Sequence, residues 1–183
     1  MIVDDHPALR AGLLTVLRSE PGITVVGAAE GSNGAMHEMR HKPDVALVDY
    51  NLPGEDGLAL CRRVKALPER PRVLMYSAHA DAALGVAARL AGADGLIDKG
   101  APADLLLDSI RVIAKNESVF ATPSREFLNS AGQLVEPEDV AILGMAIDGT
   151  PNAEMAPVLG VDLAELERRI DRMLEALSEE IAR

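Results

Sequence analysis

The chain of 183 residues is poor in aromatic residues and cysteine: it has no tryptophan, two phenylalanines, two tyrosines and one cysteine, Cys61. A single cysteine excludes an internal disulfide, and so few rings leave little surface for stacking the bases of single-stranded nucleic acid. The sequence also has no apolar run of about 18 residues and no cationic start followed by an apolar stretch, which are the marks of membrane helices and secretory signals. We therefore expect a cytoplasmic protein without a membrane partner.

Positive charge is also scarce. Lys and Arg together number 18 against 29 Asp and Glu, which gives a formal net charge of -11. Binding to nucleic acid or anionic lipid depends on surplus Lys and Arg, so the composition gives no general support for either. Any contact with DNA must therefore depend on a local group of suitable residues rather than on the overall charge. Because 48% of the residues are hydrophobic, the chain can bury a core, and its length suits one domain of common size plus a smaller one.

Short apolar runs alternate with amphipathic segments over residues 1–116. The runs that are typical of strands are 23–29, 45–50, 73–78 and 95–99. The segments with helical periodicity are 8–19, 32–41, 56–66, 81–92 and 102–115. Strands separated by single helices predict an α/β fold with a doubly wound, parallel, five-stranded sheet. Residues 1–3 supply only a stub of the first strand, so either that strand is short or the chain begins further upstream.

Polar side chains stand where the predicted strands end: Asp4 and Asp5, then Asp49 and Asn51, then Ser77, and finally Lys99. The carboxyl ends of parallel strands meet at one edge of a sheet, where ligands bind. Carboxylates brought together there repel one another, and a hard divalent cation with oxygen ligands keeps them ionised. The pattern therefore predicts a Mg2+ site and phosphoryl transfer to a carboxylate, with Lys99 and Ser77 as donors to phosphoryl oxygens. The alternative is a buried charge network without turnover.

Four segments carry a resemblance to a known family: MIVDDHPALRAGL, PDVALVDYNLPGEDGLAL, VLMYSAHAD and GADGLIDKGA. Together they resemble the receiver domain of two-component response regulators, which has a flavodoxin-like fold. By that resemblance, Asp49 is the phosphoacceptor for a sensor histidine kinase, and Ser77 and Lys99 bind the phosphoryl oxygens. The resemblance also implies that Mg2+ is held by Asp5 and Asp49 directly, by Asp4 through water and by the backbone carbonyl of Asn51. Enzymatic activity would be limited to self-phosphorylation from a phosphodonor and autodephosphorylation.

Two positions near this edge need separate comment: one departs from the family pattern, and the other has a structural interpretation besides a catalytic one. The family has an aromatic switch residue three positions before the lysine, where this chain has Leu96, so an inward rotation of a ring cannot report phosphorylation here. His6 precedes Pro7, and proline suits the first turn of a helix. We expect His6 to cap that helix locally rather than to take part in catalysis.

The remaining residues predict a second, helical unit. We assign residues 1–116 to the receiver domain and 117–134 to a linker with room for a short helix from Ser124. The helices expected beyond it are 137–147, 152–159 and 162 to about 181. Residues 135–177 resemble the LuxR/NarL-type helix-turn-helix domain, so we expect a small all-α DNA-binding domain at 135–183.

The predicted recognition helix carries the wrong charge for a DNA reader, with Glu165, Glu167 and Asp171 on it. Residues 134–183 hold 12 acidic residues against 4 arginines, a net charge of -8. The candidate DNA contacts are therefore few: Arg168, Arg169 and Arg172. Each phosphate contact depends on a cation that displaces counterions from the DNA. Because these cations are few, non-specific DNA binding should be weak.

Two hypotheses follow. The first is a phosphorylation-controlled transcription regulator that binds DNA as a homodimer. The second is a receiver whose helical domain has lost DNA binding and acts through protein contacts. An apolar stripe on the last helix fits either packing within the chain or a dimer seam; its members are Leu163, Leu166, Ile170, Met173 and Leu177.

Overall fold

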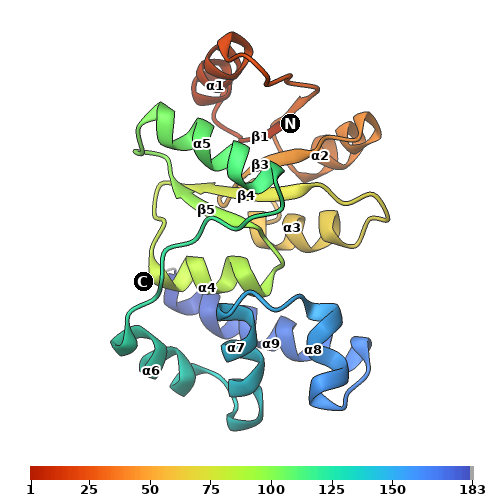
Figure 1. The fold of residues 1–183 in the computed structure, drawn as a ribbon, viewed down its shortest axis with the longest axis vertical. Coiled ribbons are helices and arrows are strands. Elements are labelled where there is room, and N and C mark those ends of the chain that lie inside the picture. Colours follow the sequence, from red (N-terminus) through yellow and green to blue (C-terminus); the bar gives the residue numbers. More distant parts are fainter. Residues whose placement is uncertain (182–183) are drawn as a thin grey trace.

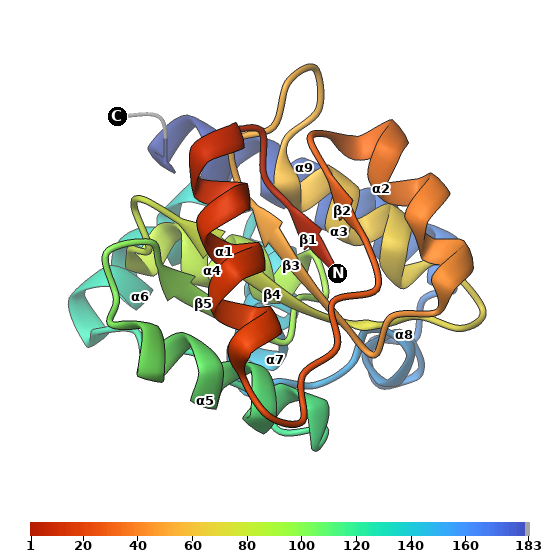
Figure 2. The same cartoon turned by 90° about the horizontal axis from the view of Figure 1, so that it is seen from above.

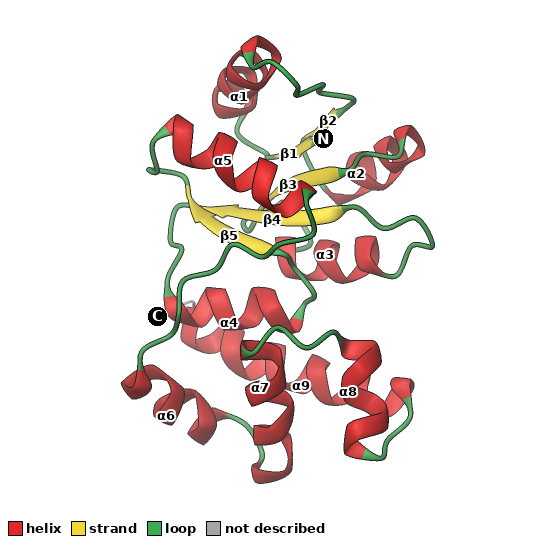
Figure 3. Cartoon of the chain, viewed as in Figure 1, coloured by secondary structure: helices red, strands yellow, loops and turns green. Residues whose placement is uncertain are grey.

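The computed structural model describes residues 1–181, and its first part is a parallel sheet with helices on both faces (Figures 1 and 3). The strand order is β2-β1-β3-β4-β5. The strands are β1 (Ile2–Val3), β2 (Ala28–Ala29), β3 (Val45–Asp49), β4 (Arg72–Ser77) and β5 (Gly95–Asp98). The helices between them are α1 (Pro7–Ser19), α2 (Ser32–Glu38) with the 3-10 turn η1 (Met39–His41), α3 (Gly57–Lys65), α4 (Ala82–Leu90) and α5 (Ala103–Ala114). The predicted fold class is confirmed.

The second strand is much shorter than predicted. Residues 23–29 read as one apolar run, but only Ala28 and Ala29 form a strand. The reason lies in its neighbour, because β1 offers only two residues for pairing, Ile2 with Ala28 and Val3 with Ala29. A strand exists only where a partner accepts and donates its backbone hydrogen bonds, so the prediction for 23–27 was wrong.

Two apolar clusters hold the sheet between its helices. One lies between the sheet and helices α1 and α5, and includes Leu13, Leu47 and Ile113. The other lies on the opposite face, under α2, α3 and α4, and includes Val48, Met75 and Leu84 (Figure 2). Residues along β3 and β4 alternate between the two clusters, as expected for strands that are buried on both faces.

The C-terminal part of the chain is helical and lies on the outer side of α4 (Figure 1). Its elements are α6 (Arg125–Leu134), the 3-10 turn η2 (Pro137–Asp139), α7 (Val140–Ile147), α8 (Asn152–Leu159) and α9 (Leu163–Ile181). Helices α6, α7 and α9 all contact α4. More than half of the predicted linker is thus a packed helix, which starts where the Ser124 side chain accepts a hydrogen bond from the amide of Phe127.

Among residues 1–181, the helical part has no apolar core separate from that of the sheet. The cluster that begins at Val48 and Met75 continues through α4 to Ile142 of α7 and Ile170 of α9. The apolar stripe of α9 is filled within the chain, because Leu166, Ile170, Met173 and Leu177 are all buried, whereas Leu163 is 52% exposed. Packing inside the chain therefore accounts for the stripe without a dimer seam. Within residues 1–181, no helix combines the length and the apolar character needed to cross a membrane.

The shared core generates a prediction for unfolding. Replacing the fully buried Ile170 with alanine should lower the free energy of unfolding by about 2–5 kcal/mol, because it leaves a cavity. Urea unfolding followed by circular dichroism should show one transition, since sheet and helices share a cluster. The matched control is Leu163→Ala on the same helix, which should change the free energy by no more than about 0.5 kcal/mol. Two separate transitions, of which only one shifts, would contradict a shared core.

Candidate functional site

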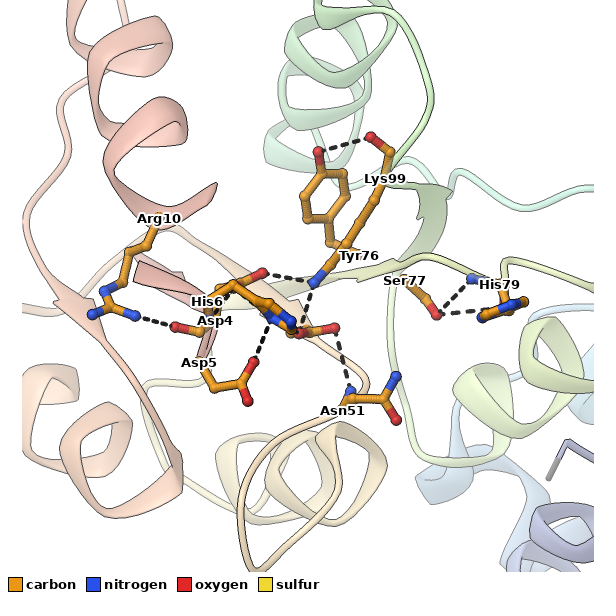
Figure 4. A network of polar contacts seen from close by, with 10 residues as sticks. Asp4, Asp5, His6, Arg10, Asn51, Tyr76, Ser77, His79 and Lys99 are labelled. Atoms are coloured by element: carbon orange, nitrogen blue, oxygen red, sulfur yellow. Dashed lines mark hydrogen bonds and ion pairs between the residues drawn. The ribbon is translucent and has the colours of Figure 1, made fainter. Parts of the chain in front are cut away.

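Three loops at the carboxyl edge of the sheet bring together two buried carboxylates and one ammonium (Figure 4). Asp4 follows β1, Asp49 ends β3 and Lys99 follows β5. Lys99 Nζ donates to Asp4 Oδ2 at 2.8 Å and to Asp49 Oδ2 at 2.7 Å, and each carboxylate is only 1% exposed. Because neither carboxylate could stay charged alone at such burial, the lysine stabilises both.

Burial and the ion pairs act in opposite directions on the protonation of this centre. Burial raises the pKa of Asp49, and the hydrogen bond and charge of Lys99 only partly oppose that rise. Burial alone would lower the pKa of Lys99, but its hydrogen bonds to Asp4 and Asp49 outweigh this and raise it. The lysine is therefore firmly cationic, while Asp49 is a more basic carboxylate than an exposed one.

The carboxylates also form a set suited to a divalent cation. Asp4, Asp5, His6 and Asp49 each offer one ligand atom, and these atoms lie within 4.8 Å of one another. Asp5 Oδ1 is buried and accepts no hydrogen bond of good geometry, and its one close polar neighbour is the imidazole of His6, at 2.7 Å. Three carboxylates around one point match the oxygen preference of Mg2+. The residues present therefore fit the predicted ion.

His6 does not act as the predicted cap. It stands at the N-cap position of α1, but its side chain makes no capping hydrogen bond. Its Nδ1 instead lies 2.7 Å from Asp5 Oδ1 and 4.0 Å from Asp49 Oδ2. The imidazole turns toward the acids, where its Nδ1 lies within ion-pair distance of their carboxylates.

Asn51 and Ser77 lie at the same edge with different partners. The backbone amide of Asn51 donates to Asp49 Oδ1 at 3.3 Å, so Asn51 lies beside the acceptor carboxylate. The Ser77 hydroxyl accepts from the amide of His79 at 3.2 Å and donates to the His79 carbonyl at 3.4 Å (Figure 4). Ser77 is thus held by its own loop, and the structure does not join it to the carboxylates and lysine.

Three further residues shape this edge, and no motif of the sequence indicates them. The Tyr76 hydroxyl donates to the Lys99 carbonyl at 3.3 Å, and Lys99 Nζ lies 5.7 Å from the centre of the Tyr76 ring. Arg10 NH1 donates to the Asp4 carbonyl at 2.5 Å. A Cβ atom at Gly57 would lie 2.2 Å from the Asp49 carbonyl oxygen, so only glycine lets α3 start so close to the acceptor.

Two acidic residues of α9 have a partner on the receiver part of the chain. Arg62 of α3 lies 2.5 Å from Glu167 Oε2 and 3.0 Å from Asp171 Oδ1. The Arg62 side chain is only 20% exposed, so these pairs are partly shielded from water. Two of the carboxylates that stand where a DNA reader needs cations therefore bind a cation of the same chain.

The three arginines proposed as DNA contacts lie in different surroundings. Arg169 is buried, and its guanidinium lies 2.5 Å from Asp139 Oδ1 and 2.5 Å from the Glu138 carbonyl oxygen. Arg168 is exposed and pairs with Glu165, whereas Arg172 is exposed with Asp139 at 3.8 Å. In this conformation Arg169 holds the 3-10 turn η2 that precedes α7, and of the three arginines only Arg168 and Arg172 face water.

Comparisons with known proteins agree with the sheet and its edge. The model of the response regulator receiver domain matches residues 1–111. The probable transcriptional regulatory protein NarL of Mycobacterium tuberculosis is 34% identical over 122 residues, which are 66% of this chain and 56% of that protein. The nitrate/nitrite response regulator protein NarP of Escherichia coli is 29% identical over 189 residues, 97% of this chain and 87% of its own.

A solved structure extends the likeness to three dimensions. The two-component response regulator of the LuxR family from Aurantimonas sp. SI85-9A1 superposes with a TM-score of 0.62 at 30% identity, over 65% of this chain and 86% of that one. The matched family model covers more than half of the sequence and includes every residue of the carboxylate-lysine centre. The chain therefore belongs to the family of response regulator receiver domain proteins.

Proposed function

We propose that this chain is a two-component response regulator that accepts a phosphoryl group on Asp49 and controls transcription through its helical part. One observation carries the first half of the proposal: a buried carboxylate at the end of β3 shares a lysine with a second acid and faces a third. The names of the relatives, a response regulator and a probable transcriptional regulatory protein, support the second half. The phosphodonor would be a sensor histidine kinase in the cytoplasm.

In the proposed reaction, an Asp49 carboxylate oxygen attacks phosphorus, the bond from phosphorus to the donor breaks, and the donor leaves with that electron pair. Asp5 and Asp49 would hold Mg2+ directly, Asp4 through water and Asn51 by its carbonyl, and the ion supplies positive charge at the phosphoryl oxygens when bound. Lys99 already lies 2.7 Å from Asp49 and needs little movement to reach a phosphoryl oxygen. The Ser77 hydroxyl must first leave His79.

Asp49→Asn should abolish phosphorylation while leaving the shape of the site nearly unchanged. Incubation with acetyl phosphate and Mg2+ should add one phosphoryl group to the unmodified chain, detected by intact mass, and none to the variant. Asp108→Asn, at an exposed carboxylate of α5, is the matched control and should label as the unmodified chain does. Labelling that persists in Asp49→Asn would overturn the acceptor assignment.

Lys99→Met should destabilise the chain by about 3–5 kcal/mol, because it leaves Asp4 and Asp49 buried without their cation. Mg2+ should restore much of this loss and stabilise the variant more than the unmodified chain, since it supplies the missing positive charge. Thermal unfolding with Mg2+ and with a chelator measures both effects. Lys115→Met at an exposed position is the control. If Mg2+ shifts no melting temperature, the assignment of these carboxylates to the ion is wrong.

A second candidate function is favoured by the ion pairs of α9. Glu167 and Asp171 bind Arg62, Arg169 is buried, and the helix shares its core with the receiver part. A helix held in this way suits a regulator that acts through protein contacts rather than on DNA. The two candidates differ in whether α9, once released, has affinity for the phosphate backbone.

DNA titrations with two variants separate these candidates. If α9 faces DNA, Glu167→Lys with Asp171→Lys should raise affinity for random duplex DNA and steepen its salt dependence by about 0.9 per lysine that contacts a phosphate. Arg62→Ala releases the same two carboxylates without adding a cation, so it separates release of the helix from the change of charge. Fluorescence anisotropy over a series of salt concentrations, starting at low salt, measures the affinity of each variant for DNA and its salt dependence. An unchanged affinity in the folded lysine variant would favour the protein-contact function.

A further inference from the structure

Tyr76 lies in the middle of the sheet, beside the residues of the carboxylate-lysine centre. It stands on β4, where it pairs in register with Asp49 of β3 on one side and with Ile97 of β5 on the other. Only 5% of its surface is exposed, although its side chain ends in a polar hydroxyl. A buried hydroxyl costs free energy unless it forms a hydrogen bond, so its partner indicates what the side chain does.

The backbone and the ammonium of Lys99 both contact this one side chain (Figure 4). The Tyr76 hydroxyl donates to the Lys99 backbone carbonyl at 3.3 Å, and Lys99 Nζ lies 5.7 Å from the centre of the ring. The second distance is within the reach of a cation–π interaction, in which the electron-rich face of a ring attracts an ammonium. Tyr76 therefore restrains the main chain of the lysine and its charged group at the same time.

The phenol provides these restraints without taking the ammonium away from the carboxylates. Burial raises the pKa of Tyr76, and the charge of Lys99 only partly opposes that rise, so the hydroxyl keeps its proton near neutral pH and donates it to the carbonyl. The face of the ring attracts the ammonium but is a weaker acceptor than a carboxylate. Lys99 Nζ therefore still donates to Asp4 and Asp49, at 2.8 and 2.7 Å.

Phosphoryl transfer makes a demand on Lys99 that these restraints meet. In the proposed reaction Nζ must shift from Asp49 Oδ2 to an oxygen of the incoming phosphoryl group. A lysine has a flexible four-carbon stem, whose freedom is lost when the ammonium is held in one place. A fixed backbone and an attractive ring limit that freedom in advance, so less of it remains to be lost in the transition state. An aliphatic residue could fill the same space but would provide neither restraint.

We propose that Tyr76 is a positioning residue for phosphoryl transfer: its hydroxyl fixes the backbone of Lys99, and its ring keeps the ammonium directed at Asp49. The proposal rests on the proposed phosphorylation of Asp49. The covalent step is the one described for that function, and Tyr76 neither gains nor loses a proton in it. Tyr76 acts only through the lysine, so its effect should depend on the lysine being present.

Packing alone is the competing explanation for Tyr76. The ring belongs to the same apolar cluster as Leu47, Leu74 and Ile97. A residue that only fills the core would affect the stability of the chain but not the rate at which the folded chain reacts. The test must therefore compare rates among variants that are shown to be folded.

Two substitutions remove the contacts stepwise. Tyr76→Phe keeps the ring and removes the hydrogen bond, whereas Tyr76→Leu removes both. With acetyl phosphate and Mg2+, intact mass followed over time gives the rate of phosphorylation of the full chain. We expect Tyr76→Phe to react about threefold more slowly than the unmodified chain, and Tyr76→Leu about tenfold more slowly. Circular dichroism at the assay temperature shows whether each variant is folded.

Leu74→Ala is the matched control, because Leu74 is fully buried on the same face of β4, two residues before Tyr76. It leaves a cavity but keeps both contacts of Lys99. It should therefore lower the melting temperature at least as far as Tyr76→Leu does, while its rate of phosphorylation stays within about twofold of the unmodified chain.

A second comparison uses Lys99→Met, assayed with Mg2+ present. In that background, adding Tyr76→Leu should cause no further loss of rate, because a residue that acts through the lysine has nothing left to position. A further tenfold loss in the double variant would show that Tyr76 acts independently of the lysine, and would overturn the proposal.

The outcomes separate this proposal from the proposed function. If the unmodified chain is phosphorylated on Asp49 and folded Tyr76→Leu reacts at the same rate, the positioning role is overturned and the proposed function stands. An unchanged rate in Tyr76→Phe decides in the same way if the leucine variant does not fold. An equal loss of rate in Leu74→Ala also overturns the role, whether or not the Lys99→Met background folds. If the unmodified chain takes up no phosphoryl group on Asp49, the proposed function fails and the positioning role fails with it.

Discussion

The contact of Lys99 with Asp4 and Asp49 is the constraint on which the carboxyl edge of the sheet depends. Two carboxylates that are each 1% exposed need a cation within hydrogen-bond reach. The strand order meets this need. Because β1 lies beside β3, Asp4 and Asp49 at their ends are neighbours, and the long side chain of Lys99 reaches them from β5 across β4. Tyr76 on β4 fills that gap and accepts the lysine against its ring.

The sequence could predict this centre because its charged residues stand at the carboxyl ends of strands. Apolar runs in the sequence locate those ends well. Asp4, Asp49 and Lys99 each stand at such an end, and the structure joins them. Asn51 also lies beside Asp49, but Ser77 stays bound to His79. The sequence could not show that 23–27 lack a strand partner, because pairing depends on the length of β1 rather than on the apolar run itself.

The negative charge of α9 could be predicted from the sequence, but the residue that pairs with it, Arg62, could not. Arg62 and Glu167 are 105 positions apart, and no local pattern indicates that α3 and α9 meet. The pairs give Glu167 and Asp171 a role within the chain, so their charge need not imply that they face another molecule. The same holds for the apolar stripe: helical spacing predicts a buried face, whereas only the fold shows that α4 and its neighbours cover it.

The shared core also limits what phosphorylation can move. Coupling between two sites is commonly worth about 1–3 kcal/mol. Exposing two fully buried side chains of the size of Leu166 and Ile170 would cost about 3–6 kcal/mol. Phosphorylation of Asp49 could therefore not by itself lift α9 from the chain. Full release of the helix would need a further favourable free energy, which a partner that binds the freed surface would supply.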